Sequence, residues 1–235
     1  MKKNNSLALS IQNLTFNYPQ KQVLNIPRLE IPMGEHTLIS GESGCGKSTL
    51  LNLVSGILTG HNGTLQVLGR DYAGMKAAEY DRFRAENIAV VFQQFNLISY
   101  LSARENILLG VKLARKEISP LDVDALLRHL QVDAVAETRA GNLSHGQQQR
   151  IAVARALAQK APLILADEPT SALDEKNARL FWDLLFNEAR ANNTTIVVVS
   201  HDVRHQKRFD RVIDFTKIND AVEVRKKNMP QKRSK

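Results

Sequence analysis

The chain has 235 residues, of which 43% are hydrophobic, so it is long enough to bury a sizeable core as one large domain. Its single cysteine, Cys45, excludes an internal disulfide, and its first residues do not resemble a signal peptide. The longest apolar runs fall far short of the roughly 20 residues that span a bilayer. We therefore expect a reducing, cytoplasmic location and membrane contact through a partner or the surface.

The net charge of +8 gathers at the C-terminal end. Residues 216–235 carry seven Lys or Arg against two acidic residues, which gives +5, whereas the body is nearly neutral. We expect a domain over residues 1–215 and a basic, solvated tail over 216–235. Attraction to anionic lipid is the next interpretation of the tail, and specific binding to nucleic acid is not expected.

Short apolar runs are continuous rather than alternating, which is typical of strands buried on both faces of a parallel sheet. They are Thr37–Ile39, Ile88–Phe92, Leu163–Ala166 and Thr195–Val199. The first 35 or so residues and Thr64–Leu68 are expected to form a small antiparallel sheet.

Helical spacing of apolar residues appears between these runs. The three sets are Ile107, Leu108 and Val111; Val123, Leu126, Leu127 and Leu130; and Phe181, Leu184 and Leu185. Because the first two fall between Gln93 and Ser144 without any strand pattern, we predict a helical subdomain at about 94–158, inserted into an α/β core.

A glycine-rich segment follows the run that ends at Ile39 and precedes a helical stretch, Thr49–Ser55. It reads Gly41-Glu42-Ser43-Gly44-Cys45-Gly46-Lys47-Ser48-Thr49 and matches the phosphate-binding P-loop pattern. Backbone N–H groups at a helix N-terminus can wrap a polyphosphate only where side chains do not block its approach. Lys47 is expected to reach the β and γ phosphates, and Ser48 to bind Mg²⁺. Cys45 is interpreted as a small filler residue rather than a redox group.

Two adjacent carboxylates, Asp167 and Glu168, end the apolar run that begins at Leu163. Successive residues of a strand point in different directions, so each can take its own task. We expect Asp167 to hold the Mg²⁺ shell and Glu168 to act as the general base on the attacking water. His201 follows another strand end, where its neutral imidazole could donate a hydrogen bond to the γ phosphate.

The segment Leu143-Ser144-His145-Gly146-Gln147-Gln148-Gln149-Arg150 resembles the LSGGQ signature of the ABC ATPase family. The resemblance covers about residues 9–215. It implies that Ser144, Gly146 and Gln147 cap a helix that faces the γ phosphate held by an opposite subunit, in a head-to-tail dimer. His145 replaces a signature glycine: if that position needs a positive φ, histidine costs roughly 1 kcal/mol or more, and otherwise it only crowds the site.

Other positions fall in the family's order. Tyr18 resembles the aromatic residue that stacks on adenine, although it could be an ordinary exposed tyrosine. Gln93 resembles the glutamine that links Mg²⁺ to the helical subdomain, although Gln94 could exchange roles with it. Ser171-Ala172-Leu173-Asp174 resembles the loop that crosses the dimer interface, which would bring Asp174 to the nucleotide.

The resemblance implies a P-loop NTPase core with a parallel sheet, a small antiparallel β subdomain and an inserted α-helical subdomain. It also implies a bacterial transporter subunit that hydrolyses ATP with Mg²⁺ at the cytoplasmic face of the inner membrane. The expected partners are transmembrane permease subunits and a second cassette, either identical or paralogous. Leu51–Gly56, Val91–Ile98 and Arg104–Ile107 look most like the group that serves lipoprotein release and macrolide or peptide export.

Three alternatives remain. A DNA-repair or chromosome-organising ABC ATPase would need a long coiled coil between Gln93 and Ser144, where no sustained heptad appears. A nonenzymatic or regulatory cassette that binds ATP and clamps a partner without transport is compatible with His145 in the signature. A GTPase is disfavoured because Thr216-Lys217-Ile218-Asn219, the nearest match to a guanine-reading motif, lacks the required aspartate.

Overall fold

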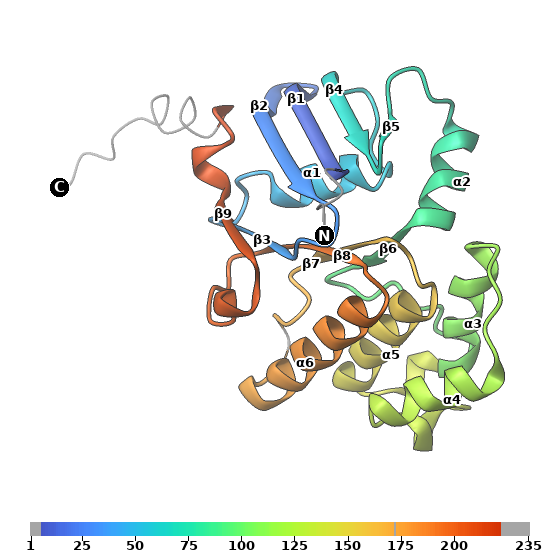
Figure 1. Ribbon diagram of the computed structural model, residues 1–235. Helices are drawn as coiled ribbons and strands as arrows, with labels where there is room; N and C mark the ends of the chain where they lie inside the picture. Colours follow the sequence, from blue (N-terminus) through green and yellow to red (C-terminus); the bar gives the residue numbers. More distant parts are fainter. Residues whose placement is uncertain (1–5, 172, 222–235) are drawn as a thin grey trace, which may run out of the picture.

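The computed structural model describes residues 6–171 and 173–221, which form two sheets with helices around them (Figure 1). Within this part of the chain, one sheet is antiparallel in the order β2-β1-β4-β5, and the other is parallel in the order β6-β7-β8-β3-β9. The antiparallel strands are β1 (Leu7–Tyr18), β2 (Lys21–Pro32), β4 (Asn62–Val67) and β5 (Arg70–Asp71). The parallel strands are β3 (Thr37–Ser40), β6 (Ile88–Val91), β7 (Leu163–Asp167), β8 (Thr195–Ser200) and β9 (Arg211–Asp214).

The four apolar runs correspond to four strands of the parallel sheet, with small differences at their ends. β6 stops at Val91, one residue before the predicted end. Every residue of β8 is buried, as a continuous apolar run predicts. The edge strand β9 was not predicted, because only Ile213 is buried and the strand has no continuous apolar run.

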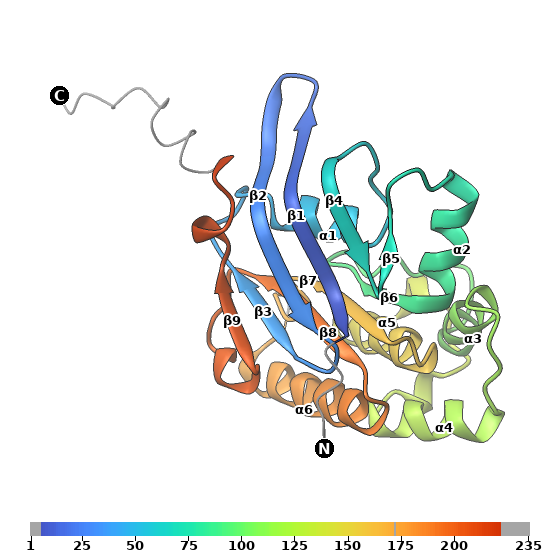
Figure 2. The same ribbon diagram turned by 45° about the horizontal axis from the view of Figure 1, so that its top comes forward.

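The described α-helices are α1 (Lys47–Val54), α2 (Ala77–Asn87), α3 (Ala103–Leu113), α4 (Pro120–His129), α5 (His145–Ala158) and α6 (Glu175–Ala191). Helix α2 escaped prediction because it buries only Tyr80 and has no apolar stripe. In α3, Ile107 and Val111 are buried as expected, but Leu108 is 38% exposed, so it does not share their face. Helices α3 and α4 lie beyond α5, on the side of the molecule opposite β9 (Figure 2).

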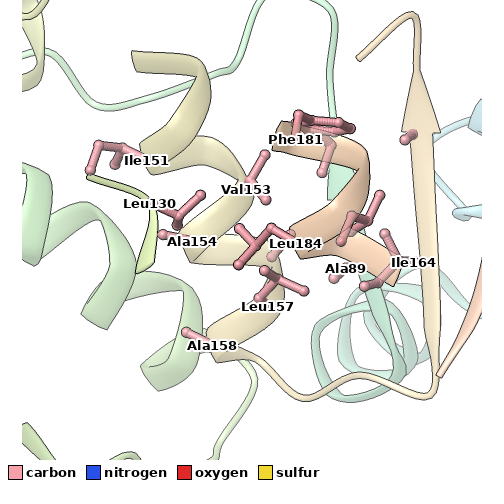
Figure 3. Packing of buried hydrophobic residues seen from close by; sticks show 14 of the residues in the cluster. Ala89, Leu130, Ile151, Val153, Ala154, Leu157, Ala158, Ile164, Phe181 and Leu184 are labelled. Atoms are coloured by element: carbon pink, nitrogen blue, oxygen red, sulfur yellow. The ribbon is translucent and has the colours of Figure 1, made fainter. Parts of the chain in front are cut away.

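The parallel sheet separates two hydrophobic clusters, because successive residues of a strand point to opposite faces. Leu163 and Leu165 of β7 join the antiparallel sheet and α1 in one cluster. Ile164 and Ala166 join α3, α4, α5 and α6 in the other. Figure 3 shows this second cluster, where side chains of α5 and α6 meet Ala89 and Ile164 of the sheet. The strands are thus covered on both sides, and their ends meet at a common edge.

The C-terminal end of the described chain packs on the body and differs from the predicted tail. Residues 216–221 continue from β9, and Asn219 is completely buried. A boundary at 216 therefore does not fit the described chain, because Asn219 and Ala221 are buried against the body. The most basic part, 222–235, lies outside the described residues. Within the described part, no helix combines the length and apolar character that a membrane span requires.

Candidate functional site

A cavity of about 980 Å³ opens where the β1–β2 hairpin, the glycine-rich segment and the C-terminal strand ends meet. The predicted residues that line it are Tyr18, Gly41, Glu42, Ser43, Gly44, Gly46, Lys47, Ser48, Thr49, Gln93, Glu168 and His201. Segments distant in the sequence thus contribute to one site. Lys21, Val23, Ser40, Val203 and Asp214 also line it and were not predicted. Ser40 stands between the predicted strand and Gly41, and Lys21 lies close to Tyr18 in the sequence, so these two could have been found.

The glycine-rich segment takes a conformation that side chains would obstruct. Gly44 and Gly46 have φ values of 76° and 110°, in the left-handed region that favours glycine. A Cβ on Gly46 would lie 3.1 Å from the carbonyl oxygen of Val23, so the segment packs directly on β2. Gly46 also caps α1, whose N-terminal N–H groups therefore lie at the cavity. This is the arrangement that binds phosphate at a helix N-terminus.

Lys47 is 5% exposed, and its Nζ donates to the carbonyl oxygens of Gly41 at 2.8 Å and Glu42 at 2.9 Å. The ammonium is thereby held across the segment while it lines the cavity. Cys45 is buried beneath the same segment and does not line the cavity. Its side chain fits the interpretation as a filler, because a Cβ on Gly41 would lie only 3.1 Å from the Cys45 Sγ.

Asp167 ends β7 next to the start of α1. Burial raises the pKa of its carboxyl, whereas a hydrogen bond from Ser48 and the charge of Lys47 oppose that rise. The Ser48 hydroxyl, the Asp167 carboxylate and the Gln93 amide oxygen are ligands of the type that Mg²⁺ takes. The described residues contain no cluster of three His, Cys, Asp or Glu that would form an all-protein metal site. The donor set therefore fits Mg²⁺, which usually combines one or two protein ligands with substrate phosphates.

Glu168 is held by the neighbouring strand end. Its Oε2 accepts a hydrogen bond from the Ser200 hydroxyl at 2.6 Å, and its Oε1 accepts from the His201 backbone N–H at 2.8 Å. Glu168 also has a φ of 46°, which turns the chain sharply after β7. Its side chain is only 12% exposed, so these bonds fix the carboxylate at the wall of the cavity.

His201 Nδ1 lies 2.7 Å from Glu168 Oε1. Because a carboxylate only accepts, Nδ1 carries the proton here, and a neutral ring then has no N–H at Nε2. The expected donation from a neutral His201 to a γ phosphate therefore does not fit this arrangement. The ring must be protonated, or must leave Glu168, before it can donate to another group.

The signature segment lies away from the cavity in its own chain. Ser144 is the N-cap of α5: its hydroxyl accepts from the Gln147 N–H at 3.3 Å, and the Gln147 side chain accepts from the Ser144 N–H at 2.9 Å. A Cβ on Gly146 would meet nothing within 4 Å, and its φ is not positive. Ser144 is exposed, so the tip of α5 is open to another molecule.

His145 is the first residue of α5, and its φ is not among the positive values of the described residues. The backbone strain considered for this position is therefore absent. Instead, the His145 ring lies 4.7 Å from the ring of Phe95, centroid to centroid. The signature accommodates the larger residue by packing it on the segment that follows Gln93.

Asp174 is the N-cap of α6 and also lies outside the cavity. Its carboxylate accepts from the Asn177 N–H at 2.8 Å and the Asn177 side-chain amide at 2.7 Å. These bonds, the backbone one first, hold the pKa of Asp174 below its usual range. Within one chain Asp174 is thus a capping residue that does not line the predicted nucleotide site.

A parallel sheet with a glycine-rich phosphate cradle at its edge defines a P-loop nucleotide-binding protein. Comparison with known proteins narrows that class. The ABC transporter family model matches residues 24–171. A phosphonates import ATP-binding protein of Pseudomonas aeruginosa is 40% identical over 87% of this chain and 78% of that relative. A macrolide export ATP-binding/permease protein of Campylobacter jejuni is 36% identical over 87% of this chain and 32% of that relative.

Solved structures of ABC transporter cassettes are also similar to this chain. The dimeric structure of the bacterial ABC transporter cassette MJ0796 has a TM-score of 0.80 and 33% identity, over 88% of this chain and 93% of that chain. A dimeric post-hydrolysis state of MJ0796 bound to ADP and Pi also has a TM-score of 0.80, over 91% of this chain and 95% of that one. The chain therefore belongs to the ABC transporter family, as an ATP-binding cassette with ATPase activity. ATP and Mg²⁺ are its ligands.

Proposed function

We propose that this cassette works in a head-to-tail pair, with an identical or paralogous partner, on the cytoplasmic face of the inner membrane. Each ATP then lies between the phosphate loop, Gly41–Ser48, of one cassette and the signature tip, Ser144–Gln147, of the other. The exposed tip of α5 carries this proposal: it caps a helix, faces open space at Gly146 and takes no part in the cavity of its own chain. The positive end of the helix dipole suits a γ phosphate.

Within each site the chain's own residues divide the work. Backbone N–H groups of the phosphate loop and Lys47 bind and neutralise the phosphates. Ser48, Asp167 and Gln93 would hold Mg²⁺, which would help to neutralise the charge of the phosphates. Tyr18 stands at the mouth of the cavity, 43% exposed, where its ring can stack on adenine.

Glu168 is the proposed general base. Its carboxylate is oriented by Ser200 and His201, so it can accept a proton from water at the γ-phosphate side of the cavity. The Nδ1–H bond from His201 holds the Glu168 carboxylate in place before it takes that proton. Phosphate release then reopens the pair, and Gln93 conveys the change to the helical segment that follows it.

We further propose that the cassette drives a separate permease that exports or extracts a lipoprotein, peptide or drug-like substrate. The segments that resemble the lipoprotein-release and macrolide-export group support this, as does the similarity to a macrolide export protein. Import is the second candidate, because a phosphonates import ATP-binding protein is 40% identical. Identifying the permease that copurifies from membranes distinguishes export from import. A permease with few membrane helices and a large periplasmic region favours export, whereas a permease of the importer type contradicts the export proposal.

The central test is Glu168→Gln in the full chain. Loss of the base should lower ATP turnover by about 100-fold or more, with ATP still bound and a closed dimer accumulating. Phosphate release and size-exclusion chromatography with ATP measure both effects. Glu117→Gln, which alters a glutamate between α3 and α4, is the control and should behave as the unaltered chain. Undiminished turnover in Glu168→Gln would remove Glu168 as the base.

A further inference from the structure

A buried asparagine that follows β9 reaches the phosphate loop. Asn219 has no exposed surface, and its side chain makes three hydrogen bonds to the backbone of distant segments. Its Oδ1 accepts from the Asn25 N–H at 2.8 Å, and its Nδ2 donates to the carbonyl oxygens of Val23 at 3.0 Å and Cys45 at 3.1 Å. One side chain thus joins the C-terminal segment, β2 and the loop.

The bond to Cys45 has a consequence for the next amide. In a trans peptide unit the C=O and the following N–H point in opposite directions, and the described residues contain no cis peptide. Because Asn219 holds the Cys45 carbonyl on the buried side, the Gly46 N–H faces the other way. Gly46 lines the nucleotide cavity, so that direction leads to the phosphates. A loop that turns its N–H groups inward must place its carbonyl groups outward, where each buried one needs a donor.

The bond to Val23 fixes the same region from β2. Val23 lines the cavity, and its carbonyl oxygen lies against the position that a Gly46 Cβ would occupy. At the other end of the loop, Lys47 plays a comparable part for the carbonyls of Gly41 and Glu42. Lys47, which holds one end of the loop, also lines the nucleotide cavity. Asn219, which holds the other end, does not line it.

We propose that Asn219 is a positioning residue for nucleotide binding: it orients the Gly46 amide and keeps the phosphate loop in register with the hairpin strand β2. The proposal rests on the proposed assignment of Gly41–Ser48 as the phosphate loop. A purely structural tether for the C-terminal end would use the same bonds, so the test must separate nucleotide affinity from stability.

Asn219→Asp keeps the size and the acceptor but removes both N–H donors, and sets an oxygen against the Cys45 and Val23 carbonyls. The chain offers a matched control in Asn106, which is 1% exposed. Asn106 also accepts one backbone N–H, from Ile98 at 2.8 Å, and donates to carbonyls such as that of Ser102 at 2.9 Å. Asn106→Asp should therefore cause a similar loss of bonds among residues that do not line the nucleotide cavity.

Calorimetric binding of ATP and of tripolyphosphate, with thermal unfolding of the full chain, gives the readout. We expect Asn219→Asp to weaken both ligands by about tenfold at a temperature where the variant is folded. We expect Asn106→Asp to lower the melting temperature and leave both affinities unchanged. If Asn219→Asp does not fold, Asn219→Ser replaces it with the same expectation, because serine is too short to reach both carbonyls and adds no charge.

Unchanged affinity in the Asn219 variant would overturn the proposal, as would equal losses in the Asn219 and Asn106 variants. Lys47→Ala distinguishes this failure from failure of the proposed site. If Lys47→Ala binds ATP normally, the phosphate-loop assignment itself is wrong. If Lys47→Ala loses binding and Asn219→Asp does not, only the role of Asn219 is wrong.

Discussion

His145 shows how a single residue can depart from a family pattern without strain. The histidine begins α5 without a positive φ, and its ring packs on Phe95, which is only 5% exposed. Phe95 and the next residue, Asn96, have φ values of 53° and 48°, so the segment after Gln93 is strained and benefits from support. The ring of His145 supplies part of that support from the signature segment.

The contact between His145 and Phe95 predicts that the free energy of unfolding depends on which residue replaces His145. His145→Gly should lower the free energy of unfolding by about 1 kcal/mol, because it removes a ring pair and places glycine in a helix. His145→Phe keeps a ring and should stay within about 0.5 kcal/mol of the unaltered chain. Urea unfolding of the two variants measures the difference. Equal stability of all three forms would show that the ring contact contributes nothing.

At the same scale, the sequence predicted many residues of the cavity but missed those that depend on distant pairing. The residues from Gly41 to Thr49, together with Gln93, Glu168 and His201, follow strand ends, and the sheet brings strand ends together. Asp214 ends β9 and Asn219 follows it. Because β9 buries only Ile213, it leaves no continuous apolar run, and the approach of these two residues to the loop had no signal in the sequence. The roles of the lining residues remain predictions for the experiments above.

Among the elements, short continuous apolar runs predicted strands of the parallel sheet, because burial on both faces leaves a continuous pattern, and helical spacing of apolar residues predicted helices between them. The elements that escaped prediction bury little: α2 buries one residue, and β9 one. Both elements depend on how they pack against the rest of the chain, which their own residues do not reveal. The opposite error occurred at Leu108, whose helical spacing suggested burial although α3 turns it toward solvent.

The packing of α3 on α5 rests on a close approach at Gly110. A Cβ there would lie 2.7 Å from the Cγ of Arg155 on α5. Arg155 in turn donates to the carbonyl oxygens of Phe95 and Asn96, each at 2.7 Å. Burial lowers the pKa of Arg155, so its charge needs these partners. Gly110 on α3 thus leaves room for Arg155 on α5 to bind the segment after Gln93.

We therefore predict that Gly110→Ala lowers the free energy of unfolding by about 1–3 kcal/mol, despite the better helix propensity of alanine. The added methyl group must displace Arg155, and the part-buried carbonyl of Phe95 then loses its donor. Chemical denaturation of the variant provides the measurement. A stability equal to or above that of the unaltered chain would contradict the close packing.

For the whole molecule, the two hydrophobic clusters place the nucleotide cavity and the signature tip on different parts of one chain. The cavity lies where the antiparallel sheet meets the parallel sheet. The tip begins α5, which lies on the other side of the parallel sheet (Figure 1). Among the described residues, nothing brings Ser144 to the phosphate loop of its own chain. In the proposed head-to-tail pair, the tip of a second cassette would therefore complete the site, and the composition of the tip should suit that partner.

Gly146 gives the sharpest test of this requirement. Its own chain offers open space within 4 Å of a Cβ and no positive φ, so nothing in the described part of the monomer calls for glycine. Gly146→Ala should leave ATP binding by the monomer unchanged and should raise the free energy of unfolding by up to about 1 kcal/mol, through helix propensity.

In the proposed dimer, however, the methyl group would face the triphosphate of the other cassette. We expect ATP turnover and ATP-dependent dimerisation in the Glu168→Gln background to fall by about tenfold or more. Gly110→Ala is the counterpart that should lose stability instead. A Gly146→Ala variant that dimerises and hydrolyses ATP normally would mean that no partner approaches this tip, and the head-to-tail arrangement would have to be abandoned.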